Sequence, residues 1–367
     1  MQKIGVGIIG SGAIALANHV PGLALCPEAR LVALCDADEQ TLAKAASRTG
    51  VDATFTDHRD LLKRADVHAV VVATPNHTHL QAVLDACATG KHVLCEKPLA
   101  LNLDDARRML RAAEEANVRH MTAFTYRFVP AMRYMKHLID SGAIGTPLHF
   151  RAQRFQDWGD RSLGWRQVKR LAGSGEMGDM LSHRIDYGHH LIGPIARLVA
   201  DFRTFVPTRG GQPSDVDDWV AMLTEFKNND VTGVLESTKL ATGRGEGHRG
   251  RDAVEVNGTQ GTLVYSTQRP HELKRGRRGG SDVERVAVPR EFLTFPGSPR
   301  DPQQGDPLVT FRYDQTIEFI RAIVEKRECS PSFRAGVAAQ AVMDAAQRSA
   351  DERRWVDVPD PGIAPAS

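Results

Sequence analysis

The feature that most constrains the fold lies at the start of the chain. Residues 4–10 form an apolar run, Ile-Gly-Val-Gly-Ile-Ile-Gly, and a Gly-x-Gly-x-x-Ala motif continues from Gly10 through Gly12 to Ala15. This pattern predicts a buried strand, a tight turn and a helix. Gly10 permits the turn, Gly12 lets a pyrophosphate approach the backbone, and Ala15 permits close packing of helix on strand. The free N–H groups at the start of the helix would face that anion.

A second apolar run, residues 30–35, ends at an acidic residue, Asp36. A carboxylate at this position can accept hydrogen bonds from the adenosine ribose hydroxyls. The alternative is an ordinary strand–turn–helix unit in which Asp36 caps the next helix. The complete strand–turn–helix context favours dinucleotide binding. Asp36 and Asp38 would repel a ribose phosphate and no Arg or Lys follows before Lys44, so the sequence predicts NAD rather than NADP.

Composition excludes several other classes of protein. Among 367 residues, Lys and Arg number 47 and Asp and Glu 45, a balance that favours neither nucleic acid nor a membrane surface as partner. No apolar run is long enough to span a bilayer. The five cysteines form no Cys-x-x-Cys pair, which fits a reducing cytoplasm.

The pattern of apolar runs changes about one third of the way along the chain. Up to residue 124, short apolar runs such as 67–73 and 92–95 alternate with helical patterns, which predicts a Rossmann-type, doubly wound parallel sheet of the α/β class. From about 197 to 288, strand patterns follow one another without helices, which indicates an α+β domain with a large, mostly antiparallel open sheet. We therefore expect a dinucleotide-binding domain over 1–125 and a substrate-binding and oligomerisation domain over 126–367.

A lysine stands at the end of one of the predicted parallel strands. The segment is His-Val-Leu-Cys-Glu-Lys-Pro, with Lys97 before Pro98, which could hold a cis bond. Ligands bind at this edge of an open α/β sheet, where an ammonium group can hydrogen-bond a substrate hydroxyl and pass on its proton. The alternative is an exposed lysine before a turn.

A second candidate for proton transfer lies in a predicted helix over 176–192. Asp179 and His183 are four residues apart and would share a helix face, with Asp186 three residues further on. A carboxylate orients an imidazole and raises its basicity, which makes an Asp–His pair a common general base. The alternatives are a surface ion pair, or metal ligands joined by His190. We expect no metal site, since no Cys or clustered carboxylates complete one.

Two charged, glycine-containing segments are interpreted as loops. Residues 269–278 contain Lys274, Arg275, Arg277 and Arg278, which favours a solvated basic loop. Residues 243–251 alternate Gly with Arg, His and Glu, which indicates a mobile or ligand-facing loop between strands.

Taken together, these segments resemble the glucose–fructose oxidoreductase / inositol dehydrogenase / rhizopine-catabolism (Gfo/Idh/MocA) family over nearly the whole chain. The marks are Gly10-Ser11-Gly12, Ala73-Thr74-Pro75-Asn76 with His79, Glu96-Lys97-Pro98, Tyr126-Arg127-Phe128, Asp179 with His183 and Asp186, and the segment from Ser332 to Val358. Glu-Lys-Pro is the most specific of them. One departure is Leu181, which stands where the family often has glycine and could narrow the pocket or shift the helix.

The resemblance implies a role for each matching residue. Lys97 would contact the hydroxyl that is oxidised, His183 would take its proton, and Asp179 would hold substrate and relay partners. The implied cofactor-binding residues are Gly10, Ser11, Gly12, Ala13, Ile14, Asp36, Thr74, Pro75, Asn76, His79, Glu96 and Lys97. The implied substrate-binding residues are Lys97, Tyr126, Arg127, Trp165, Arg166, Asp179 and His183.

The expected function is an NAD-dependent dehydrogenase that oxidises a secondary hydroxyl of a sugar, sugar derivative or cyclic polyol. The first alternative is a reductase of a keto-sugar or related carbonyl, which runs the same chemistry backwards. The second is a dinucleotide-binding sensor without turnover, which would have no need of Lys97, Asp179 and His183 as a proton relay. The resemblance also implies a homodimer or homotetramer formed through the sheets of the second domain.

Overall fold

The chain folds into two compact units. The structure is a computed structural model in which residues 3–227, 231–246 and 250–363 are described. Unit 1 takes in the chain up to Thr125 together with Thr294–Val337, and unit 2 takes in Tyr126–Leu293 and the chain from Ala338 onward. The predicted domain of 126–367 is therefore not continuous, because one segment of it packs with unit 1.

Unit 1 is built on a six-stranded parallel sheet with the strand order β3-β2-β1-β4-β5-β6. The strands are β1 (Ile4–Ile9), β2 (Ala29–Cys35), β3 (Thr54–Phe55), β4 (Ala69–Val72), β5 (His92–Cys95) and β6 (His120–Thr122). All four residues of β4 are fully buried, as its uninterrupted apolar run predicts. The strand order reverses between β1 and β4, and ligands of such sheets bind at the carboxyl ends of the strands at this switch point.

Unit 1 also contains helices and helical turns, most of which connect or follow the strands of this sheet. They are the π-helical turn η1 (Ala15–His19), α1 (Val20–Leu25), α2 (Glu39–Thr49), α3 (His58–Leu62), the 3-10 turn η2 (Asn76–Thr78), α4 (His79–Ala88), α5 (Leu103–Glu115), α9 (Pro307–Thr310) and α10 (Tyr313–Val324). The last of these packs on α1, where Gly22 lies so close to Thr316 that an added Cβ would stand 2.9 Å from the Thr316 Cβ. This close packing is the physical reason that Thr294–Val337 returns to unit 1. An amphipathic pattern alone cannot identify such a distant partner.

Unit 2 is built on a nine-stranded sheet with the order β16-β15-β14-β13-β7-β12-β11-β8-β17. Its strands are β7 (Pro147–Phe155), β8 (Ile195–Arg203), β11 (Trp219–Phe226), β12 (Thr232–Thr238), β13 (Arg251–Gly258), β14 (Gly261–Ser266), β15 (Glu272–Arg277), β16 (Val283–Ala287) and β17 (Val356–Asp357), and a separate hairpin pairs β9 (Thr208–Arg209) with β10 (Gln212–Pro213). Only the β7–β12 pair is parallel among these pairings. The predicted fold class, a Rossmann-type sheet followed by a mostly antiparallel sheet, is confirmed.

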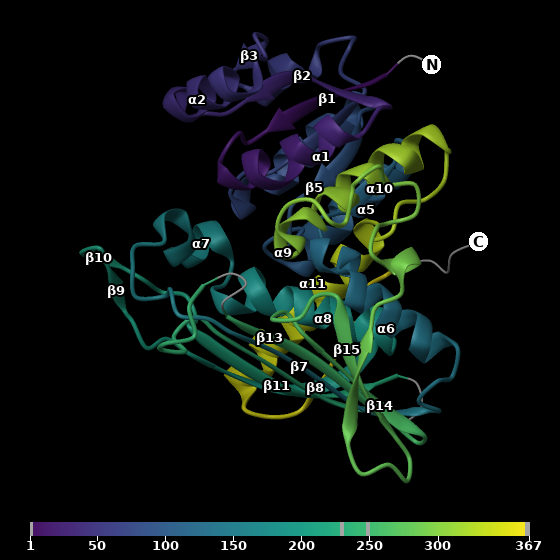
Figure 1. Cartoon of the computed structure of the whole chain (residues 1–367). Helices are drawn as coiled ribbons and strands as arrows, with labels where there is room; N and C mark the ends of the chain where they lie inside the picture. The colour runs from purple at the N-terminus through teal and green to yellow at the C-terminus, as the bar shows by residue number, and fades with distance from the viewer. Residues whose placement is uncertain (1–2, 228–230, 247–249, 364–367) are drawn as a thin grey trace. The chain divides into compact units, whose positions relative to one another are not determined.

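The two faces of the large sheet differ. Figure 1 shows α6 (Pro130–Asp140) and α8 (Ser182–Leu191) over one face, where Phe150, Leu235 and Val254 are fully buried. Alternate residues point to the other face, where Leu223 is 49% exposed. The remaining helices and helical turns are η4 (Gly164–Gln167), α7 (Lys169–Ala172), η5 (Met177–Leu181) and η7 (Arg290–Phe292) in unit 2, and η3 (Thr125–Phe128) and α11 (Phe333–Glu352), which begin in unit 1 and end in unit 2. No helix of the described residues is both long and apolar enough to cross a membrane.

The prediction of a solvated basic loop at 269–278 is wrong, because most of this segment is strand β15. It pairs with β14 on one side and with β16 on the other, and Leu273 is its buried side chain. Charged residues hide the strand pattern, yet backbone pairing with two neighbours outweighs them. The other predicted loop, 243–251, connects β12 to β13, and residues 247–249 lie outside the described residues.

Candidate functional site

The two glycines of the first turn meet different surroundings. Gly10 follows β1 with φ +91°, and a Cβ added there would stand 2.6 Å from the backbone of Ala73 and Thr74 at the end of β4. An added Cβ at Gly12 would meet nothing within 4 Å. Close approach of two strand ends therefore requires Gly10, whereas the backbone at Gly12 borders open space.

Asp36 holds the same turn from the end of β2. Its Oδ2 accepts a hydrogen bond from the Ser11 N–H at 2.8 Å, and its Oδ1 accepts one from the Asp38 N–H at 3.0 Å. The cap of α2 is Asp38, whose Oδ1 accepts from the Thr41 N–H at 2.7 Å. The alternative interpretation of Asp36 as the helix cap is therefore wrong. Its carboxylate is only partly buried and retains lone pairs for further donors.

His79 connects the ends of β4 and β5. Its ring is fully buried, with Nε2 3.0 Å from the Thr74 carbonyl oxygen and Nδ1 3.1 Å from the Pro98 carbonyl oxygen. Burial lowers the pKa of His79, although both carbonyls act in the opposite direction. Both ring nitrogens face the backbone, so the geometry suits a residue that positions the two loops.

Glu96 and Lys97 stand side by side at the end of β5. Glu96 is buried, and a 2.8 Å hydrogen bond joins its Oε1 to Nε2 of His19 on η1. Burial by itself raises the pKa of Glu96, but the hydrogen bond with His19 and the charges of His19 and Lys97 hold it below its usual value overall. Lys97 is half-buried, and the Lys97–Pro98 bond is cis, as the sequence suggests.

The other half of the predicted chemistry lies in unit 2. Asp179 belongs to η5, a π-helical turn, and His183 to the first turn of α8, so the helix predicted over 176–192 begins with wider turns than expected. His183 is 3% exposed, and its ring meets the ring of Tyr126 edge-on at a centroid distance of 4.6 Å. Leu181 is fully buried, so this departure from the family pattern belongs to the core of the unit.

The remaining predicted substrate residues are engaged with neighbours in unit 2. Arg127 forms a two-pronged ion pair with buried Asp186, with Nε 2.8 Å from Oδ2 and Nη2 2.5 Å from Oδ1. Burial raises the pKa of Asp186, and Arg127 partly offsets this effect. The guanidinium of Arg166 lies over the Trp165 ring, 4.4 Å from its centroid. Arg127 is thereby fixed by a carboxylate, whereas Arg166 is exposed.

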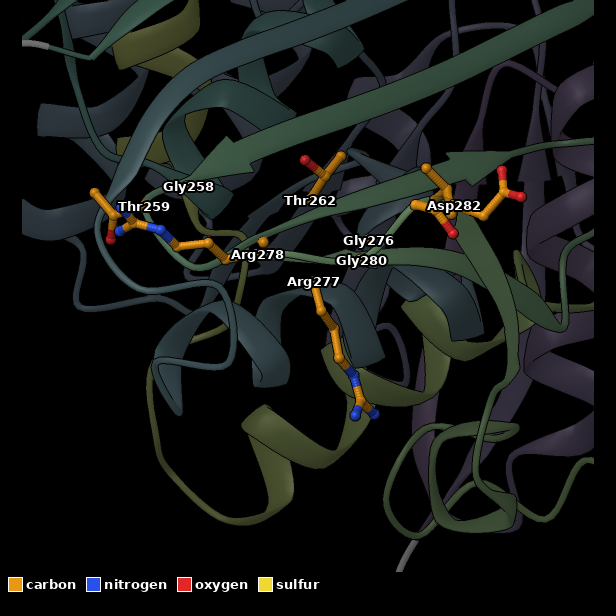
Figure 2. A pocket seen from close by; sticks show the side chains of 11 residues that line it. Gly258, Thr259, Thr262, Gly276, Arg277, Arg278, Gly280 and Asp282 are labelled. Carbon is orange, nitrogen blue, oxygen red and sulfur yellow. The ribbon is translucent and has the colours of Figure 1, made fainter.

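The basic residues of the β14–β16 region line a separate open pocket (Figure 2). It is lined by Gly258, Thr259, Gly261, Thr262, Gly276, Arg277, Arg278, Gly280, Ser281, Asp282 and Val283, and includes no predicted site residue. Figure 2 shows the Arg277 and Arg278 side chains pointing in different directions, so they do not converge on one ligand. Within the described ranges, no group of three or more His, Cys, Asp or Glu residues could hold a metal ion.

Four residues that hold predicted site residues or their neighbours in place were not predicted from the sequence. They are His19, Glu176, Asp217 and Lys239. His19 follows the glycine turn and Glu176 precedes Asp179 by three residues, so nearness to a motif was an available signal for both. Asp217 and Lys239 lie far from any motif in the sequence.

Comparison with known proteins finds two family models that match successive parts of the chain. Residues 4–124 match a family model described as "Oxidoreductase family, NAD-binding Rossmann fold", and residues 132–264 match the GFO/IDH/MocA C-terminal domain. Levoglucosan dehydrogenase of Pseudarthrobacter phenanthrenivorans is 34% identical, with 98% of this chain and 99% of that protein covered. Myo-inositol 2-dehydrogenase of Thermotoga maritima is 30% identical, with 72% and 75% covered. A solved structure of levoglucosan dehydrogenase with NADH and levoglucosan has a TM-score of 0.88 at 33% identity, covering 98% of this chain and 100% of that one.

The contrast between the two glycines gives a matched pair of substitutions. Gly10→Ala should lower the free energy of unfolding by about 2 kcal/mol or more, because the side chain combines an unfavourable φ with backbone overlap. Gly12→Ala should change stability by less than about 0.5 kcal/mol but weaken dinucleotide binding roughly tenfold or more. Denaturant unfolding and NAD titration measure the two effects. Equal stability losses in both variants would contradict the assignment of a packing role to Gly10 and a cofactor-binding role to Gly12.

Proposed function

Since this chain belongs to the Gfo/Idh/MocA family of NAD-binding oxidoreductases, we propose that it oxidises a secondary hydroxyl of a sugar, sugar derivative or cyclic polyol. The observation that carries the proposal is the edge of the first sheet at the carboxyl ends of its strands, where Gly12 leaves space for a pyrophosphate and Lys97 follows the end of β5 by two residues. The named relatives support the substrate class, since they are dehydrogenases of an anhydrosugar and of a cyclic polyol.

Different residues of the chain have different roles in the proposed reaction. Bound NAD would supply the hydride acceptor, so that loss of a hydride from the carbinol carbon would leave a carbonyl and one proton. Lys97 donates a hydrogen bond to the reacting hydroxyl oxygen, and the imidazole of His183 accepts the proton. Asp179 orients that imidazole and stabilises its charged form. Thr74, Pro75 and Asn76 line the cofactor in this proposal, with His79 holding their loop against Pro98.

One assay separates this proposal from its alternatives. NADH absorbance is followed over a panel of sugars and cyclic polyols with NAD, and over the corresponding keto compounds with NADH. If only the keto compounds were turned over, the protein would be a reductase rather than a dehydrogenase. Dinucleotide binding without turnover of any member would favour a sensor and contradict the proposal.

We also propose that the protein is a cytoplasmic homo-oligomer. The five cysteines are free and buried, which suits a reducing compartment. The face of the large sheet opposite α6 and α8 carries Leu223, which is 49% exposed, and is the surface through which two copies would pair.

Asp36 should make NAD the preferred cofactor. Its carboxylate lies beside the Ser11 amide, where it would repel a ribose phosphate and accept hydrogen bonds from ribose hydroxyls. Dissociation constants measured by titration should favour NAD in the wild type, and Asp36→Ala should reduce the preference. The control is Asp38→Ala, which removes a helix cap and should change the preference less. Tighter NADP binding by the wild type would overturn the argument.

Lys97→Ala should leave NAD binding largely intact and lower turnover by roughly two to four orders of magnitude, the range for a positioned proton-transfer group. The matched control is Lys63→Ala, which removes an exposed lysine paired only with Asp60 among the described ion pairs. Turnover is measured at saturating NAD with the best substrate of the panel. Near wild-type turnover in Lys97→Ala would show that Lys97 has no catalytic role and is an ordinary lysine at the end of a strand.

His183→Ala should cost turnover on a similar scale and remove the acidic limb of the pH–rate profile. The imidazole must be neutral to accept a proton, so activity rises as it loses its own. Asp179→Asn should move that limb toward lower pH, because it removes a negative charge that favours the imidazolium. The measurement is kcat/KM against pH for wild type and both variants. A limb that survives in His183→Ala would assign the proton to another group.

A further inference from the structure

A buried carboxyl group that the reaction above does not use stands at the start of the turn that carries Asp179. Glu176 is fully buried, and its Oε1 accepts a hydrogen bond from the Ser237 hydroxyl at 2.6 Å. Its Oε2 lies 4.0 Å from Nζ of Lys239 and has no hydrogen-bond partner among the described residues. Lys239 is itself 2% exposed, so both members of this pair are out of water.

The surrounding elements hold this pair in place. The carboxylate of Asp217 accepts N–H bonds from Gly175 at 2.6 Å and from Met177 at 2.8 Å, on either side of Glu176. A Cβ added to Gly159 would stand 2.2 Å from Cγ of Lys239, so the lysine stem is tightly packed. The Lys239 ammonium lies 5.6 Å from the centre of the Trp158 ring. The pair is therefore part of an ordered core rather than a surface contact.

The charges around Glu176 do not balance. Besides burial, the negative charges of Asp179 and Asp217 both raise the pKa of Glu176, whereas Lys239 is the one described cation whose charge lowers it. On β7, Arg154 lies 3.7 Å from Asp252, which also pairs with Arg184 of α8. Before β11, Asp218 is paired with Arg209.

This environment places the ionisation of Glu176 near neutral pH. Burial, together with the charges of Asp179 and Asp217, raises the pKa of Glu176 to about 7, while Lys239 and the Ser237 hydrogen bond lower it. Within the pH range of most enzyme assays, the charge beside Asp179 therefore depends on whether Glu176 holds a proton.

We propose that Glu176 is a positioning residue of the reaction. When Glu176, buried beside Lys239, gains or loses a proton, the negative charge beside Asp179 changes. This change sets the pH range in which the Asp179–His183 pair accepts the substrate proton. Glu176 touches neither substrate nor cofactor and acts only through Asp179. The inference rests on the proposed function, because it assigns Asp179 and His183 their roles.

Charge-removing variants test this inference by their pH–rate profiles. Glu176→Gln should move the acidic limb of kcat/KM to lower pH by about half a unit or more, because it removes a negative charge from beside Asp179 while Lys239 keeps its positive charge. The double variant Glu176→Gln with Lys239→Met restores the balance of charge and keeps the packed stem, so its limb should return toward that of the wild type. An unmoved limb in Glu176→Gln, or a double variant displaced further than the single one, would overturn the inference.

A second measurement needs no substrate and separates this inference from the proposed function. A pKa of Glu176 raised to about 7 in the folded state means that its contribution to stability is complete below the unfolded value and is lost as pH rises through about 7. The denaturant midpoint of the wild type should therefore fall between about pH 5 and 8 relative to that of Glu176→Gln. In a double-mutant cycle with Asp179→Asn, the coupling between the two sites should grow over the same range.

The outcomes of the two measurements are distinct. A wild type without turnover on any substrate contradicts the proposed function, and the unfolding cycle then still decides whether Glu176 controls the charge beside Asp179. Parallel pH curves for wild type and Glu176→Gln, or a coupling that does not change with pH, would overturn the inference whatever the activity.

Discussion

The close approach of two strand ends in the first sheet is the constraint on which the proposed cofactor-binding part of unit 1 depends. Gly10 lies against the backbone of Ala73 and Thr74, where no side chain fits. This contact brings the turn after β1 beside the turn after β4, at the point where the strand order reverses. Asp36 then fixes the turn through the Ser11 amide, and His79 fixes the neighbouring loop. The open space above Gly12 is a consequence of this packing.

Buried carboxyl groups with specific partners recur in both units. Glu96 is held by His19, Asp186 by Arg127, and Glu176 by Ser237 and Lys239. Burial penalises the charged form of each, and only a close donor or cation offsets that penalty. The balance differs among them, since the pKa of Glu96 stays below its usual value while that of Glu176 rises to about 7. The differences follow from the number and sign of the neighbouring charges.

The pattern of apolar residues in the sequence predicted secondary structure correctly where the side chains of a segment are uniformly buried. The apolar run of β4 is visible in the sequence, and it forms a strand as predicted. The pattern failed where backbone pairing or a distant partner decided the outcome. Strand β15 carries charged residues on a pairing backbone, and α10 packs on α1 across nearly three hundred residues of sequence.

The sequence by itself determined the class of fold, the glycine turn, the strand end that presents Lys97, and the spacing of Asp179 and His183. These are local properties, because a motif of a few residues contains the reason for each. Only the tertiary structure decided that Asp36 meets the Ser11 amide, that His19 meets Glu96, and that Lys239 meets Glu176. Such partners come from separate elements, and their distance depends on how the sheets and helices pack rather than on any nearby residue.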